Sequence, residues 1–351
     1  MKKTIAVLPG DGVGPEVVSE SVRVLKKVAE KFNHQFNFEY GLIGAAAIDK
    51  NRDPYPMETH ILCKKSDAIL FGAIGDPKYD NNPKAKVRPE GGLLRMRKSL
   101  GLYANIRPIK VFPSLVDRSP LRKEVVDGTD FVVIRELIGG IYFGKRGRKN
   151  YGQVAYDTST YSVDEIARVA EQAFELAMKR RCKVTVVDKA NVLETSRLWR
   201  ETVDKLKVRY KKLEIEYMFV DNCAMQIIKN PKRFDVILTE NMFGDILTDE
   251  ASVIAGSIGM LPSASFGENT SLYEPIHGSY PKAAGKNIAN PTGAILSAAM
   301  LLDHSFGMKK ESRSISKAVK KALEKGYGTR DIVLKNPTGT KEFGDAIISF
   351  I

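Results

Sequence analysis

Two aspartates in the segment N-M-F-G-D-I-L-T-D-E-A-S have a spacing that could hold a metal ion. Asp245 and Asp249 are one helical turn apart, so both carboxylates would lie on one face of a helix. Asp221 follows a strand-like run earlier in the chain. Carboxylate oxygens suit Mg²⁺ or Mn²⁺, which keep coordination positions open for water and substrate. The alternative is that acidic residues in a first helical turn offset the helix dipole.

Three arginines in the same half of the chain could bind a di-acid. Arg97 lies in a helical stretch, Arg107 just beyond it, and Arg135 in the strand-like run V-V-I-R-E-L. A guanidinium makes bidentate pairs with carboxylates, so three that converge would bind a small dicarboxylate, although each alone is typical of a surface ion pair. Leu93 and Leu94 come one turn before Arg97, which predicts an apolar patch beside the cationic one. The combination suits a substrate with two carboxylates and one alkyl branch.

Two further residues have the chemistry of a base and an acid. Lys189 ends the strand-like run K-V-T-V-V-D-K-A, and Tyr142 lies in the segment G-G-I-Y-F-G. A partly desolvated lysine beside other cations can act as a base, and a tyrosine in the same pocket can donate a proton. Taken singly, either residue is typical of a structural role.

Two glycine-containing segments could approach a ligand through their backbones. Residues 9–16, P-G-D-G-V-G-P-E, lie between a strand-like and a helical segment, but they match neither G-x-G-x-x-G nor a P-loop. They indicate at least a tight turn. Residues 273–291 are rich in Gly, Pro, Asn and small residues, which favours a loop whose amides approach a ligand closely; the alternative is an ordinary surface loop.

The elements that must position these residues alternate along the chain. Six strand-like runs (TIAVLP, DAILFGAIG, DFVVIREL, KVTVVDKA, LEIEYMFVD and FDVILTEN) are separated by segments of helical periodicity. One such segment has Val18, Val22 and Leu25 on a single face, and another begins with the capping-box pattern Ser162-x-x-Glu165. The alternation predicts an α/β fold. At 351 residues the chain can form two lobes or one large unit, and no internal repeat or linker places a boundary.

Composition limits the class of protein. Hydrophobic residues make up 43% of the chain and charged residues 28%, and no run is long enough to cross a membrane, so we expect a soluble protein. The apolar run at the N-terminus is too short for a signal peptide and predicts a first strand. The three cysteines form no C-x-x-C pair, which suits a reducing cytoplasm. The net charge of +13 allows nucleic-acid binding or a lysine-rich solvated surface; basic residues without interleaved aromatics favour the surface.

Taken together, these segments resemble the isocitrate/isopropylmalate dehydrogenase family over nearly the whole chain. The family motif N-x-x-G-D-I-L-S/T-D corresponds to Asn241 through Asp249, and its cofactor loop corresponds to His277 through Asn290. The resemblance implies a two-lobed α/β fold that is not the usual Rossmann fold. It implies a discontinuous cofactor-side domain, 1–103 and 256–351, and a substrate, metal and dimerisation domain, 104–255. It also implies a cytoplasmic homodimer whose active site is shared between subunits.

The activity implied by the resemblance is the oxidative decarboxylation of 3-isopropylmalate to 2-oxoisocaproate in leucine biosynthesis, with NAD and Mg²⁺ or Mn²⁺. The three arginines would bind the malate carboxylates. Asp245 and Asp249 would bind the metal together with Asp221 of the partner subunit. Asp221 of the partner subunit would also bind the substrate. Lys189 of the partner subunit would be the base and Tyr142 the acid. Glu90, Leu93 and Leu94 would select the substrate, because isocitrate enzymes place small polar residues there. The cofactor-binding set would be Glu274, His277, Gly278, Ser279, Tyr280, Pro281, Lys282, Ala283, Ala284, Gly285 and Asn290.

One position departs from the family pattern. NAD-dependent members usually have Asp where this chain has Lys282, and NADP-dependent isocitrate enzymes often have Lys there, followed by Tyr rather than Ala283. A lysine could meet a 2′-phosphate, so the sequence leaves NAD and NADP both open. Two other interpretations also stay open: a family member that acts on isocitrate, homoisocitrate or tartrate, and a basic nucleic-acid-binding protein on the same scaffold.

Overall fold

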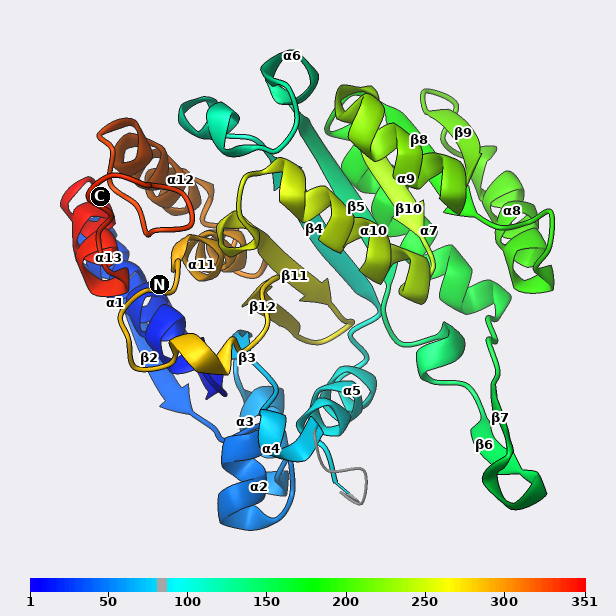
Figure 1. Cartoon of the computed structure of the whole chain (residues 1–351), viewed down its shortest axis with the longest axis horizontal. Helices are drawn as coiled ribbons and strands as arrows, with labels where there is room; N and C mark the ends of the chain where they lie inside the picture. Colours follow the sequence, from blue (N-terminus) through cyan, green and yellow to red (C-terminus); the bar gives the residue numbers. More distant parts are fainter. Residues whose placement is uncertain (81–86) are drawn as a thin grey trace. The chain divides into compact units, whose positions relative to one another are not determined.

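The computed structural model describes residues 1–80 and 87–351, and the chain divides into two compact units (Figure 1). Unit 1 comprises Met1–Leu102, Phe112–Ser119 and Ala255–Ile351, and unit 2 comprises Tyr103–Val111 and Pro120–Ile254. Residues 112–119, which fall within the 104–255 domain that the family resemblance implies, belong to unit 1. Among the described residues, no helix has the length and apolar character needed to cross a membrane.

The described residues of unit 1 form five strands in the order β2-β1-β3-β12-β11. The first four are parallel, and β11 is antiparallel to β12. Every residue of β3 is buried, as expected for a parallel strand covered on both faces. The bounds are β1 Lys2–Gly10, β2 Gln35–Tyr40, β3 Ala68–Ala73, β11 Pro262–Phe266 and β12 Ser271–Pro275.

The helices of unit 1 build one core with these strands. Helix α1 buries Val18, Val22 and Leu25, the face that its periodicity predicts, and α11 is apolar nearly all round because it packs against α1, α12, β11 and β12. The bounds are α1 Gly14–Phe32, α2 Ala45–Asn51, α3 Met57–Lys65, α4 Pro77–Asp80, α5 Pro89–Ser99, α11 Thr292–His304, α12 Lys309–Glu324 and α13 Thr340–Ser349, with 3₁₀ turns η1 Pro113–Arg118, η5 Ile258–Met260 and η6 Pro281–Ala283.

The larger sheet of unit 2 has five strands in the order β4-β5-β10-β8-β9; β4 is antiparallel to β5, and the other pairs are parallel. Helix α7 begins with the predicted capping box between Ser162 and Glu165. The strands are β4 Ala104–Lys110, β5 Asp130–Glu136, β8 Lys183–Asp188, β9 Glu214–Phe219 and β10 Val236–Thr239. The helices are α6 Lys123–Val126, α7 Val163–Met178, α8 Glu194–Lys207, α9 Val220–Lys229 and α10 Asn241–Ile254, with 3₁₀ turns η2 Gly140–Tyr142, η3 Asn150–Gly152 and η4 Pro231–Arg233.

A hairpin formed by β6 (Arg146–Lys149) and β7 (Val154–Asp157) extends away from the rest of unit 2 (Figure 1). Its two strands form a separate two-stranded sheet, and all but one of their residues are exposed.

The predicted α/β fold is confirmed, and all six strand-like runs form strands. In unit 2 most of the predicted site residues lie at or just after the carboxyl ends of parallel strands, which is where α/β sheets usually bind ligands. Arg135 lies near the end of β5, α10 begins two residues after β10, Lys189 follows β8, and Asp221 lies in the first turn of α9 after β9.

Candidate active site

Helix α10 presents one polar face to the end of β5. Asn241, Asp245 and Thr248 lie three or four residues apart, so they share this face. Gly244 lies between them, and its missing side chain leaves room for Arg135, since a Cβ there would lie 2.8 Å from the Arg135 Cβ. The close approach of helix and arginine therefore depends on glycine at this position.

Arg135 is buried and held by α10. Its Nε and Nη2 atoms both donate to Asn241 Oδ1, at 2.9 and 2.7 Å, and its Nη1 atom donates to Asp245 Oδ1. Because one amide oxygen receives two of its donors, the plane of the guanidinium is fixed relative to the helix.

Arg107, on β4, reaches the same face of α10. Its Nη1 donates to Thr248 Oγ1, and its Nε donates to Asn105 Oδ1 at 2.8 Å. It also lies 3.7 Å from Asp245 Oδ1 and 3.8 Å from Asp249 Oδ1. Two of the three predicted carboxylate-binding arginines, Arg107 and Arg135, thus contact Asp245, and Arg107 also lies beside Asp249.

The two aspartates differ in charge environment. Burial acts to raise the pKa of Asp245, but the positive charges of Arg135 and Arg107 outweigh it and hold the pKa below its usual value. Burial raises the pKa of Asp249, whose side chain is nevertheless 67% exposed. Carboxylate oxygens one turn apart, one of them open to solvent, are a donor set that suits a hard divalent cation.

Tyr142 completes this cluster. It lies in η2, and its hydroxyl donates to Asp245 Oδ2 at 2.9 Å. Burial and the negative charge of Asp245 raise the pKa of Tyr142 to about 12. The hydroxyl therefore keeps its proton at neutral pH and can act as a proton donor.

Lys189 and Asp221 form a second polar pair in unit 2. The Lys189 ammonium donates to Asp221 Oδ1, and both side chains are partly exposed. Within the described part of the chain, no group of three or more His, Cys, Asp or Glu residues could hold a metal ion. Asp221 therefore does not join Asp245 and Asp249 within one chain, and its role in their metal site stays a prediction that requires a second subunit.

The remaining predicted substrate residues lie on α5 in unit 1. Arg97 is 8% exposed, and its Nη2 donates to Glu274 Oε1 on β12 at 3.0 Å. Its Nε atom is buried without a hydrogen-bond partner among the described residues. Leu93 and Leu94 are partly exposed, and Glu90 is exposed. Convergence of Arg97 with the two arginines of unit 2 stays a prediction.

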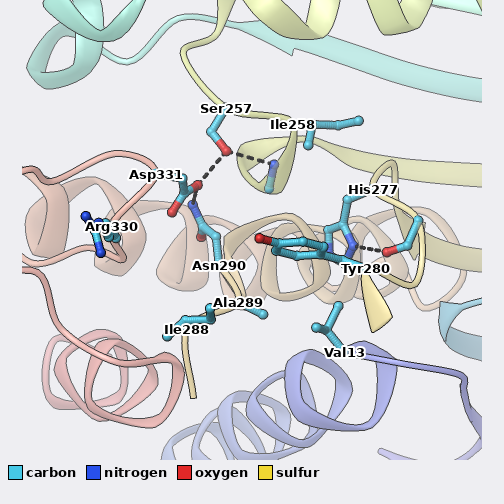
Figure 2. Close-up of a pocket in the computed structure, with 12 residues that line it drawn as sticks. Val13, Ser257, Ile258, His277, Tyr280, Ile288, Ala289, Asn290, Arg330 and Asp331 are labelled. Carbon is cyan, nitrogen blue, oxygen red and sulfur yellow. Dashed lines mark hydrogen bonds between the residues drawn. The ribbon is translucent and has the colours of Figure 1, made fainter. Parts of the chain in front are cut away.

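A pocket of about 480 Å³ lies in unit 1 beside the loop that follows β12 (Figure 2). Small-molecule sites commonly have volumes of about 300–1,000 Å³. Four of the predicted cofactor residues line it: His277, Gly278, Tyr280 and Asn290. The other lining residues are Val13, Ser257, Ile258, Gly259, Ile288, Ala289, Arg330 and Asp331. Lys282, the residue that departs from the family pattern, is exposed on η6 but does not line this pocket.

Polar groups in the pocket are arranged for a ligand with donors. Asp331 accepts hydrogen bonds from Asn290 Nδ2 at 2.9 Å and from Ser257 Oγ (Figure 2). It also accepts from Thr329 Oγ1 at 2.6 Å, so its carboxylate is held in place. His277 Nδ1 donates to the Gly278 carbonyl at 2.9 Å. The neutral ring then has an acceptor at Nε2, which is buried and has no partner among the described residues. A nucleoside, with its amino and hydroxyl donors, fits this wall.

The glycine-containing turn after β1 supports the pocket. Asp11 is buried and accepts from the backbone amides of Ala45, Ala46 and Gly75 at 2.9–3.0 Å. The backbone amide of Val13, two residues after Asp11, donates to the Ser279 carbonyl at 2.8 Å. Residues 9–16 therefore support the loop at 276–291, and Val13 also lines the pocket.

The sequence analysis did not propose several residues that the structure places in these sites. Asn241 and Thr248 share the helical spacing of the two aspartates, and that periodicity would have found them. Ser257, Ile258, Arg330 and Asp331 come to the pocket from two distant segments, which only the fold brings together.

The chain is similar in sequence and in structure to known dehydrogenases. The sequence profile of the isocitrate/isopropylmalate dehydrogenases matches residues 4–347. The 3-isopropylmalate dehydrogenase of Bacteroides fragilis is 55% identical, with 99% of this chain and 98% of that protein covered. The enzyme of the same name from Bacillus subtilis is 56% identical, with 95% and 92% covered. Isocitrate dehydrogenase from Methylococcus capsulatus matches with a TM-score of 0.90 and 31% identity over 99% of both chains. A β-decarboxylating dehydrogenase from Thermococcus kodakarensis matches with a TM-score of 0.81 and 36% identity, covering 99% and 96%.

Proposed function

The chain belongs to the isocitrate/isopropylmalate dehydrogenase family, and on that premise we propose that it oxidises and decarboxylates 3-isopropylmalate to 2-oxoisocaproate with reduction of NAD. This reaction is a step of leucine biosynthesis. The observation that carries the proposal is the cluster on α10, where two arginines and a protonated tyrosine meet two aspartates one helical turn apart. These are the groups that binding and decarboxylating a 2-hydroxy di-acid requires.

We assign the metal to Asp245 and Asp249, with Asp221 of the partner subunit as the third carboxylate. Members of this family are metal-dependent dehydrogenases. Bound Mg²⁺ or Mn²⁺ supplies Lewis acidity that favours loss of the hydroxyl proton and of CO₂. The donor set fits, because Asp245 stays ionised beside two arginines and Asp249 is open to solvent.

The protein groups then have distinct tasks. Arg107 and Arg135, together with Arg97 of unit 1, bind the two substrate carboxylates and orient C2 and C3. Lys189 of the partner subunit takes the hydroxyl proton. Tyr142, whose hydroxyl is protonated at neutral pH, delivers a proton to C3 after CO₂ has left.

Two features of unit 2 support the proposal of a homodimer. The exposed surface of α9 and α10 contains Met225, Ile228, Ile246 and Val253, and the β6–β7 hairpin exposes Val154 and Tyr156. An isolated two-stranded hairpin is marginally stable in water, so a second copy that covers it stabilises both. A second copy would also supply an Asp221 as the third carboxylate beside Asp245 and Asp249, a set of three that the described residues of one chain do not form.

We place the adenosine part of the dinucleotide in the pocket of unit 1, with the nicotinamide as hydride acceptor from C2. His277 Nε2 and the Asp331 carboxylate provide acceptors for the amino and hydroxyl groups of a nucleoside. We also expect the enzyme in the cytoplasm, because its three cysteines are free.

The substrate assignment rests on Leu93 and Leu94, which present alkyl groups where a third carboxylate would need a polar partner. A panel of 3-isopropylmalate, isocitrate, homoisocitrate and tartrate with Mg²⁺ and NAD tests it. We expect the highest kcat/KM for 3-isopropylmalate, with isocitrate at least roughly 100-fold lower, since a di-acid pocket leaves the extra carboxylate unpaired. A higher kcat/KM for isocitrate would show that the substrate assignment is wrong.

A further inference from the structure

Glu136, the last residue of β5, is a fully buried carboxylate beside the substrate-binding cluster. Its exposed fraction is 0%, and the nearest cation, Arg168 Nη2, lies 4.0 Å away. A buried carboxylate is costly unless hydrogen bonds compensate it. Glu136 accepts two, from the backbone amides of Ile138 at 3.0 Å and Gly139 at 2.8 Å. The carboxylate thus binds the backbone of the segment that follows its own strand.

That segment, residues 137–142, is fixed at several points. Besides the two bonds to Glu136, the Gly140 amide donates to the Thr160 carbonyl at 3.0 Å. Gly140 has a φ of +71°, and a Cβ there would lie 2.3 Å from the Tyr161 hydroxyl oxygen. The segment therefore fits closely against Tyr161, and it ends at Tyr142, the proposed acid.

Asn241 joins this segment to Arg135. Its Nδ2 donates to the Gly139 carbonyl at 3.0 Å, so the side-chain oxygen is turned toward Arg135. That oxygen accepts from Nε and Nη2 of Arg135, and Nη1 is directed to Asp245. The Glu136 carboxylate is thus linked to the guanidinium through Gly139, whose N–H donates to Glu136 and whose carbonyl accepts from Asn241.

We propose that Glu136 is a positioning residue: its carboxylate fixes the 137–142 segment, which orients Arg135 through Asn241 and carries Tyr142 to Asp245. The proposal rests on the proposed function, since Arg135 and Tyr142 are taken as substrate-binding and acid groups. Glu136 is wholly buried, so it acts on the reaction only through these two residues. Gln at this position has one acceptor oxygen and one NH₂ group, so one of the two amides loses its acceptor.

The test compares Glu136→Gln with Asp235→Asn. Asp235 is also a buried carboxylate of unit 2 that accepts a backbone amide, from Arg181 at 2.8 Å, but it precedes β10 and lies at the other end of that strand from α10. Glu136→Gln should lower kcat and raise KM for 3-isopropylmalate, with kcat/KM falling roughly 10- to 100-fold, since small displacements of binding groups cost about that much. KM for NAD should not change. Asp235→Asn should lower thermal stability and leave kcat and both KM values at the wild-type level.

Two further measurements keep the proposal open to contradiction. Asn241→Asp keeps an acceptor for Arg135 but removes the donor to Gly139, and it should reproduce the kcat and KM changes. Hydrogen exchange of peptides covering 137–142 should be faster in Glu136→Gln and unchanged in Asp235→Asn, whatever the substrate is. Wild-type exchange in this segment, or wild-type kcat and KM in folded Glu136→Gln, would overturn the proposal. Failure of wild-type protein to oxidise 3-isopropylmalate would instead count against the proposed function.

Discussion

The Asp245 carboxylate and the Tyr142 hydroxyl have different protonation states at neutral pH because their surroundings differ. Two guanidiniums keep Asp245 ionised, while burial and the Asp245 charge keep Tyr142 protonated. Neighbouring groups whose pKa values are pushed apart are typical of acid-base sites. At neutral pH the same hydrogen bond therefore joins an anion that suits a metal to a hydroxyl that can give up a proton.

Glu136 should give the protein a pH-dependent stability. Burial raises its pKa from an ordinary 4.5 to about 7, so the folded state binds its proton more tightly than the unfolded state. The resulting stabilisation is complete below about pH 4.5 and is lost as the pH rises through about 7, with a size on the order of 3 kcal/mol. The free energy of unfolding in urea should therefore decline less between pH 5 and pH 8 in Glu136→Gln than in wild type. Equal declines in the two proteins would contradict the pKa assigned to Glu136.

A substitution at Arg330 tests which residue would bind the 2′-phosphate of NADP. This exposed arginine lines the pocket, and Lys282 does not. A hydrogen bond to a charged group contributes about 1.5–3 kcal/mol, so Arg330→Ala should reduce kcat/KM for NADP roughly tenfold or more and leave the value for NAD within about threefold. Lys282→Ala is the matched control and should leave kcat/KM for NADP and for NAD close to the wild-type values. If only Lys282→Ala changed the preference between NAD and NADP, Lys282 on η6, and not Arg330, would be the residue that distinguishes the two cofactors.

At the scale of elements, β5, β8, β9 and β10 of unit 2 and helix α10 could be predicted from the sequence, whereas β4, the strand of unit 2 that carries Arg107, could not. β5, β8 and β10 are apolar runs, whereas β4 contains Asn105, Arg107 and Pro108 and does not have the pattern of a buried strand. It is buried because Thr248 and Asn105 satisfy the guanidinium of Arg107. Local patterns do not contain such tertiary hydrogen bonds, so polar buried strands are missed.

The contact between α10 and β5 should be sensitive to one methyl group. Gly244→Ala places a Cβ 2.7 Å from Arg135 Cγ, and the buried guanidinium has little room to move. We expect a loss of about 1–3 kcal/mol from overpacking, partly offset by the better helix propensity of Ala, and a fall in kcat/KM of roughly 10- to 100-fold. Gly91→Ala, in α5 with nothing within 4 Å of the added Cβ, should be neutral or slightly stabilising and keep wild-type kcat/KM. Unchanged kinetics in Gly244→Ala would show that Arg135 tolerates displacement.

At the scale of the molecule, the fold class follows from the alternation of strands and helices, and the finer division does not. The run of η1, residues 113–118, lies between β4 and α6 in sequence, yet it belongs to unit 1, where Leu115 joins the core cluster and η1 packs against α12. Nothing in the local pattern indicates that crossing. The pocket likewise combines residues near 13, 258, 277–290 and 330, which only the folded chain brings together.

Sharing of the site between two subunits can be tested by mixing inactive variants. Lys189→Met and Asp245→Asn should each be inactive. An equimolar mixture of the two, after subunit exchange, should regain about a quarter of wild-type activity, because half of its dimers are mixed and each mixed dimer has one intact site of two. Mixing Lys189→Met with Asp221→Asn is the control: both residues come from the same subunit of a site, so no activity should return. Failure of the first mixture, with dimers shown to exchange, would contradict a shared site.

The most direct measurement of the central claim is the product stoichiometry of metal-stripped protein given 3-isopropylmalate and NAD. We predict no turnover in excess chelator, and, after Mg²⁺ or Mn²⁺ is added, one NADH and one CO₂ formed for each 3-isopropylmalate consumed. NADH formed without CO₂, or turnover that persists in the chelator, would contradict a metal-assisted oxidative decarboxylation at Asp245 and Asp249.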